Sequence, residues 1–179
     1  DLKGNGVHKT TEQGYDGKGQ IRVATGDDAV SCWNDLNTNE AILESFIDFT
    51  AEVSFLVWRD ANGQTGVFPA ARNTHKNGIL ATSISPAAGI DPTTLKDGVD
   101  AAIALAEAVN LHGVMAMESF VNHAGQIIFN EIAPRPHNSF HWTIEGCVTS
   151  QFAQLVRIIA GLGPGDTSVR GSWRMAPKL

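Results

Sequence analysis

Two carboxylates, Glu118 and Glu131, stand in otherwise apolar segments of the sequence, which makes them candidates for chemistry. The segments, residues 113–121 and 126–133, have the composition of β-strands. The Asn-His-Ala-Gly run between them predicts a hairpin loop. We therefore expect the two acids to lie on neighbouring strands of one hairpin.

The register of this hairpin decides how the two acids meet. If the four-residue loop closes at its ends, Glu118 faces Phe129, Glu131 faces Ala116, and all four side chains share one face. The carboxylates are then diagonal neighbours, and two like charges so close are unfavourable unless a cation or proton intervenes. Mg²⁺ bound to ATP phosphates fits this need, because Mg²⁺ uses one or two carboxylates together with phosphate oxygens. The alternative is a solvent-facing acidic pair on a one-sided sheet.

A glycine-rich segment near the start of the chain could hold an anion. Its three glycines let backbone N–H groups approach a phosphate closely, and its two lysines could neutralise a polyphosphate. These residues are Lys9, Gly14, Gly17, Lys18 and Gly19. The segment lacks the GK[ST] ending of a Walker A loop and continues into a strand. The alternative is a hairpin turn with two solvated lysines.

Residues 130–142 form a polar segment directly after the second acidic strand. One arginine, two histidines, two asparagines and a serine crowd into thirteen residues, and two prolines restrict the path of the backbone. Polar groups on a restrained loop beside a metal site are typical of a substrate-orienting surface. The alternative is a loop whose polar groups satisfy its own backbone.

The remaining pattern predicts an α+β fold of antiparallel hairpins with a few helices. Helical periodicity or composition favours helices at 27–36, 94–110 and 148–159. Further strands are expected on both sides of the glycine-rich segment and at 41–47, 51–59, 66–71 and 83–88. Residues 72–81 are expected to form a polar loop, and no regular structure is predicted after residue 164.

Composition narrows the class of protein. The 179 residues carry a net charge of −6, which argues against a nucleic-acid or anionic-membrane surface. The two cysteines form no metal or disulfide pattern, which fits a reducing cytosol, and the sequence has no apolar run of 18 residues. We expect a cytoplasmic enzyme with small-molecule partners, and with neither nucleic-acid nor membrane partners.

Seven segments in a fixed order resemble the ATP-grasp superfamily, and within it the family of 5-(carboxyamino)imidazole ribonucleotide synthases. The resemblance runs from about Val7 to Leu162. The segments are Lys9, Gly-Tyr-Asp-Gly-Lys-Gly-Gln (14–20), Glu-Ser-Phe-Ile (44–47), Glu-Val-Ser (52–54), Asn-Thr-His-Lys-Asn-Gly-Ile-Leu (73–80), Met-Glu-Ser-Phe (117–120) and Asn-Glu-Ile-Ala-Pro-Arg-Pro-His-Asn-Ser (130–139).

The resemblance implies a role for each matching residue. The ATP phosphates would be held by Lys9, Gly14, Tyr15, Asp16, Gly17, Lys18, Gly19 and Gln20. Adenine would lie against the hinge strand Glu44, Ser45, Phe46 and Ile47, ribose on Glu52, and His75 would line the nucleotide site. Glu118 and Glu131 would bind Mg²⁺, with Asn130 alongside. Arg135 and His137 would be catalytic, and the bicarbonate and ribonucleotide side would comprise Arg135, His137, Asn138, Ser139 and His141.

The implied reaction is carboxylation of aminoimidazole ribonucleotide with ATP and bicarbonate. The rivals are another ATP-grasp ligase, such as a formate-dependent ribonucleotide transformylase, and a non-catalytic ATP-binding module. The resemblance implies a small subdomain at 1–59, a larger one at 60–163 and a tail at 164–179. We expect a central portion of a homodimeric enzyme without its N- and C-terminal domains.

Three positions depart from the family's pattern. Phe140 stands where the family usually has glycine, which puts the fit of the ribonucleotide in question. Thr11 and Glu12 stand where basic residues are common.

Overall fold

The structure is a computed structural model, and it describes residues 5–11, 19–24, 26–76 and 78–177. The chain forms two compact units. The first comprises Asp1–Asp48 with Lys76–Ile79, and the second comprises Phe49–His75 with Leu80–Leu179. These units differ from the expected division at residue 59, because the strand that begins at Phe49 is central to the larger sheet and not part of the first unit.

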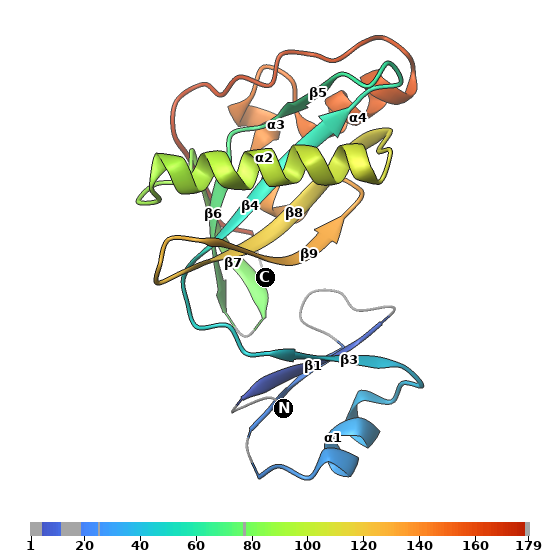
Figure 1. Ribbon diagram of the computed structural model, residues 1–179. Helices are drawn as coiled ribbons and strands as arrows, with labels where there is room; N and C mark the ends of the chain where they lie inside the picture. The colour runs from blue at the N-terminus through green and yellow to red at the C-terminus, as the bar shows by residue number, and fades with distance from the viewer. Residues whose placement is uncertain (1–4, 12–18, 25, 77, 178–179) are drawn as a thin grey trace. The chain divides into compact units, whose positions relative to one another are not determined.

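The first unit is a three-stranded antiparallel sheet with one helix (Figure 1). In the sheet, β1 lies between β2 and β3. The elements are β1 (Gly6–Thr10), β2 (Gln20–Val23), α1 (Ala29–Leu36) and β3 (Ala41–Ser45). Asp28 caps α1, since its carboxylate accepts hydrogen bonds from the backbone N–H groups of Val30 and Ser31.

The second unit is built on a seven-stranded sheet in the order β10-β7-β6-β4-β8-β9, with β5 paired to β4. Its strands are β4 (Phe49–Arg59), β5 (Thr65–Val67), β6 (Ala71–Lys76), β7 (Ile79–Ser85), β8 (Gly113–Asn122), β9 (Ile127–Ala133) and β10 (Trp173–Met175). Its helices are α2 (Pro92–Ala108), η1 (Asn138–Phe140), α3 (Thr143–Gly146) and α4 (Gln151–Ile159). The long pair β4 and β8 forms the centre of the sheet and supplies most of its buried side chains.

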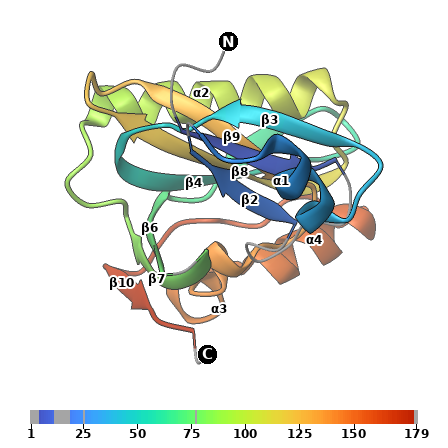
Figure 2. The ribbon, with the colours of Figure 1, turned by 90° about the horizontal axis from the view of Figure 1, so that it is seen from below.

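Helices cover the two faces of the larger sheet separately. Helix α2 lies along one face, and α3 and α4 lie along the other (Figures 1 and 2). Side chains of β4 alternate between these layers: Phe55 and Val57 pack in the core beneath α2, whereas Leu56 and Trp58 pack in the core on the α4 side. By the same alternation, Ser54 faces the α4 side.

The approach of α2 to the sheet is close enough to require a glycine. A Cβ at Gly98, in the middle of α2, would lie 2.1 Å from the ring of Phe55. Replacing a helix-interior glycine with alanine normally stabilises a helix by about 1 kcal/mol. Here the added methyl overpacks the core, at about 1–3 kcal/mol.

We therefore expect Gly98→Ala to lower the free energy of unfolding by on the order of 1 kcal/mol, as measured by urea denaturation. The double variant with Phe55→Leu should recover part of the loss, because the shorter side chain leaves room for the methyl group. A single variant more stable than the wild type would contradict the packing argument.

The α+β class expected from the sequence is confirmed, with antiparallel strands and packed helices. The expected polar loop at residues 72–81 is wrong, because most of it lies in β6 and β7. The tail is also not irregular throughout, since β10 pairs with β7. No helix among the described residues is long and apolar enough to cross a membrane.

Candidate functional site

The two acids of the β8–β9 hairpin lie directly opposite each other. The register pairs Val121 with Ile127 and, beyond a bulge, Glu118 with Glu131. The expected diagonal arrangement is therefore wrong, as is the expected partner Phe129, which pairs with Ser119. The two acids do share one face of the sheet, as expected, and direct opposition brings like charges closer than a diagonal would.

Glu118 is the more enclosed of the two acids, with 13% of its side chain exposed, whereas Glu131 is exposed. Oε1 of Glu118 accepts a hydrogen bond from the Ser54 hydroxyl at 3.1 Å and lies 3.6 Å from Nδ1 of His137. Burial raises the pKa of the Glu118 carboxyl above its ordinary value of 4.5, and the charge of Glu131 raises it further, outweighing His75 and Ser54, which lower it. The pair is thus poorly compensated by the protein itself.

This acidic pair fits a divalent cation. Opposed carboxylates supply hard anionic oxygens. A bound cation would offset both the repulsion between the two carboxylates and the cost of burying the charge of Glu118. In the described part of the chain, no cluster of three or more His, Cys, Asp or Glu side chains surrounds a common metal position. The protein would thus supply two ligands and leave the others to phosphate oxygens and water, as is usual for Mg²⁺.

A row of buried polar side chains continues from Glu118 across the sheet. Ser54 of β4 pairs directly with Glu118 of β8. Asn73 of β6 donates from Nδ2 to Ser54 Oγ at 2.5 Å, and the hydroxyl of Ser83 of β7 donates to Asn73 Oδ1 at 2.8 Å. Sequence reasoning assigned no role to these three residues, although Ser54 and Asn73 lie in segments that carry the family resemblance.

Glu52 and His75 form a second polar pair on the same two strands, β4 and β6. Nδ1 of His75 lies 2.9 Å from Oε2 of Glu52. Burial lowers the pKa of His75, but the hydrogen bond to Glu52 and the charges of Glu52, Glu118 and Glu131 outweigh burial, so the pKa lies above 6.5. The structure thus brings together two residues that the resemblance placed separately, on ribose and along the nucleotide.

The polar loop after β9 is anchored by the start of α4. The Gln151 side chain accepts from the backbone N–H of His137 at 2.8 Å and donates to its carbonyl at 2.9 Å. Nδ1 of His137 is also 2.8 Å from Oγ of Ser139, which is fully buried. These contacts fix His137 beside Glu118. Gln151 was missed by sequence reasoning, since its place at the start of an amphipathic helix resembles an ordinary helix terminus.

The other residues of this loop divide between the core and the surface. Phe140 is fully buried among the core side chains on the α4 face, so its ring does not lie on the loop surface. Arg135 and His141 are exposed, and Arg135 donates to the carbonyl of Pro136 at 3.0 Å. Asn138 accepts the backbone N–H of Ser139. The departure from the family pattern at Phe140 therefore does not block the surface of the loop directly.

In the first unit, Nζ of Lys9 forms an ion pair with Glu44 at 2.7 Å across β1 and β3. The guanidinium of Arg22 lies over the exposed ring of Phe46, 4.9 Å from its centroid. Gln20 begins β2, and Gly19 precedes it with a positive φ. Five residues of the predicted phosphate loop lie outside the described residues: Gly14, Tyr15, Asp16, Gly17 and Lys18.

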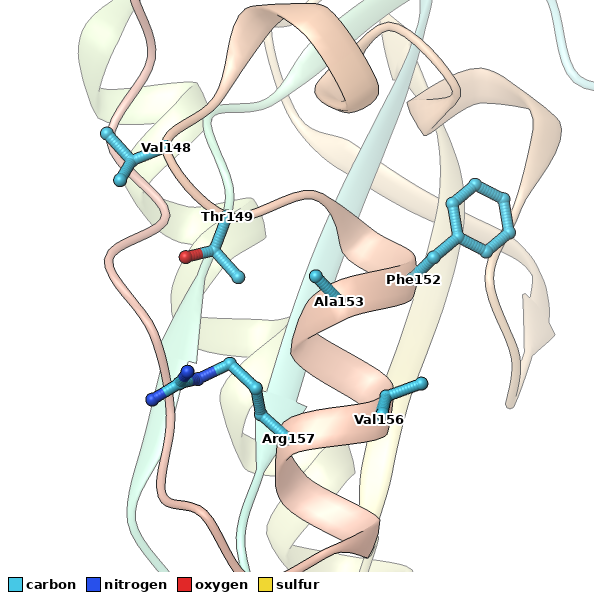
Figure 3. A pocket seen from close by; sticks show the side chains of 6 residues that line it. All are labelled: Val148, Thr149, Phe152, Ala153, Val156 and Arg157. Atoms are coloured by element: carbon cyan, nitrogen blue, oxygen red, sulfur yellow. The ribbon is translucent and has the colours of Figure 1, made fainter.

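A shallow pocket beside the start of α4 is another candidate for a site in the second unit. It is lined by Val148, Thr149, Phe152, Ala153, Val156 and Arg157 (Figure 3). Its one charged group is committed to the backbone, since Arg157 donates to the carbonyl of Gly163 at 3.1 Å. These lining residues offer no acid, histidine or cysteine for acid–base or metal chemistry, so the acidic pair is the better candidate.

The sequence is similar to a known domain family and to enzymes that share one name. The ATP-grasp domain model matches residues 1–152. The N5-carboxyaminoimidazole ribonucleotide synthase of Brucella melitensis is 45% identical over 93% of this chain and 46% of its own length. The enzyme of the same name from Bacillus subtilis is 41% identical over 91% of this chain and 43% of its own length.

The same likeness holds in three dimensions. The crystal structure of the ADP complex of purK, an N5-carboxyaminoimidazole ribonucleotide synthetase, superimposes with a TM-score of 0.91 at 42% identity, over 98% of this chain and 46% of that one. The chain thus spans less than half the length of these relatives. The domain match over most of the sequence, together with the antiparallel sheets and the opposed acids, shows that this chain belongs to the ATP-grasp family.

Proposed function

We propose that this chain supplies the nucleotide- and metal-binding core of an enzyme that carboxylates 5-aminoimidazole ribonucleotide, using ATP and bicarbonate. The observation that carries the proposal is the direct opposition of Glu118 and Glu131, with His137 held 3.6 Å from Glu118. Two opposed carboxylates beside a restrained polar loop suit a magnesium nucleotide better than a structural role. The names of the similar proteins support the choice of substrate.

The reaction would transfer the γ-phosphoryl group of ATP to an oxygen of bicarbonate, releasing ADP. The amine of the ribonucleotide would then attack the carboxyl carbon, with loss of phosphate and a proton. Bound Mg²⁺ would be held by Glu118 and Glu131, with Asn130 alongside, and would neutralise charge on the phosphate oxygens. Catalysis in such a site is mainly positioning and charge stabilisation.

The polar loop would hold the reacting anions. The exposed guanidinium of Arg135 would bind the transferred group with parallel hydrogen bonds, which a planar fork allows. His137 would be catalytic beside it, oriented by Ser139 and by the two hydrogen bonds between the His137 backbone and the Gln151 side chain. Since Ser139 is fully buried, we narrow its role from substrate binding to orienting His137. Asn138 and the exposed His141 would remain on the ribonucleotide side.

The family resemblance supports a role for each of the predicted nucleotide-binding residues. The phosphates would bind Lys9, whose ammonium is paired with Glu44, together with residues 14–20. Adenine would lie against residues 44–47, and the pair Glu52 and His75 would hold the ribose as one hydrogen-bonded unit. The family resemblance further supports a homodimer and a cytoplasmic location.

Product analysis tests this proposal. With Mg²⁺, ATP and aminoimidazole ribonucleotide, we expect ADP release and a carboxylated ribonucleotide to depend on bicarbonate, and formate not to replace it. A formylated product would favour the transformylase instead. ATP binding without turnover in the intact protein would favour the non-catalytic module and contradict the proposal.

A further inference from the structure

Four side chains from four neighbouring strands form one hydrogen-bonded row. The row runs from Ser83 on β7 through Asn73 on β6 and Ser54 on β4 to Glu118 on β8. Ser54 and Ser83 are fully buried, and 5% of Asn73 is exposed. The row therefore leads from the interior of the sheet to the acidic pair.

Every hydrogen bond in the row points the same way. The Ser83 hydroxyl donates to the Asn73 carbonyl oxygen, which fixes the orientation of the amide. The Asn73 amide then donates to the oxygen of Ser54, which leaves the single hydroxyl proton of Ser54 for Oε1 of Glu118. Because the Ser54 oxygen already accepts a hydrogen bond from Asn73, its hydroxyl proton is directed to Glu118. The row therefore presents Glu118 with a hydrogen-bond donor.

Stability alone gives no reason for such a row. Its members lie beside apolar core positions, with Leu56 and Ala71 each two residues along the same strands. Buried polar groups are unfavourable unless every donor and acceptor is satisfied, and replacing both partners of a pair with apolar groups can be nearly neutral. A fully satisfied network does restrict conformation, however, and this row ends on a proposed metal ligand.

We propose that Ser54, Asn73 and Ser83 are positioning residues that hold the Glu118 carboxylate in the orientation that binds the divalent cation. The inference rests on the proposed function, since it takes Glu118 as a metal ligand. Groups that hydrogen-bond to a metal-binding carboxylate fix its direction, and their loss typically weakens metal affinity about 10–100-fold. Without the Ser54 proton, Glu118 would keep its charge but lose the bond that orients it.

The first test compares Ser54→Ala with Ser119→Ala in the intact protein. Ser119 is buried next to Glu118 but on the opposite face, and its hydroxyl has no hydrogen-bond partner among the described residues. The dissociation constant of Mn²⁺ in the presence of ADP is measured by electron paramagnetic resonance. We expect Ser54→Ala to weaken Mn²⁺ binding about 10-fold or more, and Ser119→Ala to leave it unchanged.

A kinetic measurement separates positioning from general damage. In Ser54→Ala, the Mn²⁺ concentration that half-saturates the rate should rise, whereas kcat at saturating Mn²⁺ should fall less. Equal metal affinity in the two serine variants would overturn the inference. Glu118→Gln separates the proposed metal site from the proposed positioning role. Normal Mn²⁺ affinity in both Glu118→Gln and Ser54→Ala would contradict the metal site itself. Normal affinity in Ser54→Ala together with weakened affinity in Glu118→Gln would contradict the positioning role alone.

The far end of the row gives a second comparison that does not disturb the residues around Glu118. Ser83 and Ser85 are both fully buried on β7 and both hydrogen-bonded, but Ser85 donates to backbone carbonyls outside the row. We expect Ser83→Ala to weaken Mn²⁺ binding, less than Ser54→Ala does, and Ser85→Ala to leave it unchanged. The same affinity in these two variants would overturn the inference even if Ser54→Ala failed to fold.

Discussion

Replacing Glu131 with glutamine is expected to lower the rate of ATP-dependent carboxylation by about 10³-fold, since a bound cation contributes several kcal/mol of charge stabilisation. Glutamine keeps the shape of the side chain but removes one of two hard anionic oxygen ligands. Glu131 lies directly opposite Glu118 and is the one acid on β9, all of whose residues the structure describes. No other acid on that strand can therefore take its place. Steady-state kinetics over a range of Mg²⁺ concentrations measures the effect.

The same variant should be no less stable without metal. The folded state disfavours ionised Glu118, whose raised pKa is due to burial and then to Glu131. Ionised Glu118 therefore lowers the free energy of unfolding at a pH above its raised pKa, and this loss of stability is absent below the ordinary value of 4.5. In a chelator at pH 7, Glu131→Gln should therefore melt at a higher temperature than the wild type, and this advantage should disappear as the pH falls toward 4.5.

Glu107→Gln is the matched control for this prediction. Glu107 is an exposed acid on α2, which covers the other face of the sheet, so its loss should change neither turnover nor the pH dependence. If Glu131→Gln turned over normally at low Mg²⁺, the acidic pair would be structural. A variant that lost activity together with its fold would show instead that Glu131 supports the hairpin.

Replacing Arg135 with lysine is expected to lower carboxylation by about 10²-fold, the scale for losing one preorganised anion-stabilising donor. Arg135 leaves β9 four residues after Glu131 and lies between two prolines, which restrict its backbone. One guanidinium nitrogen bonds the carbonyl of Pro136, and the planar group keeps further donors for an anion. A lysine retains the charge but cannot form two parallel hydrogen bonds.

ATP affinity should change little in Arg135→Lys, because the proposed adenine and ribose contacts lie elsewhere. A direct ATP titration beside steady-state kinetics separates the two effects. Arg157→Lys is the control, since its guanidinium also bonds backbone carbonyls but lies on α4, away from the acidic pair. Unchanged turnover would place Arg135 outside the reaction centre, whereas a collapse of ATP binding would make it a nucleotide-binding residue.

The sequence predicted the acidic hairpin but not its register. The turn shifts the pairing by one residue, so that Val121 meets Ile127, and the bulge beside Glu118 shifts it by one more. Each one-residue shift exchanges the two faces of a strand, so the two shifts together return Glu131 to the predicted face. Bulges have no reliable signal in sequence, which is why the shared face was predicted while the direct opposition was not.

The supporting residues were harder to predict than the acids. Residues 73–76 read as a polar loop because their polar side chains hide the strand pattern, yet Asn73 satisfies its amide inside the sheet. Buried serines such as Ser54 and Ser83 look like ordinary strand residues until the neighbouring strands are known. Their partners lie 19, 10 and 64 residues away, and local pattern carries no information at those separations.

The contact of Gly98 with Phe55 has an evolutionary consequence. A Cβ at position 98 requires either that the ring of Phe55 shifts or that residue 55 becomes smaller, so substitutions at the two positions are coupled. Related sequences with alanine or a larger residue at the first position should carry a side chain smaller than phenylalanine at the second. An order of substitution is favoured as well: a smaller residue at position 55 comes before a larger one at position 98, because the opposite order passes through the overpacked and less stable intermediate.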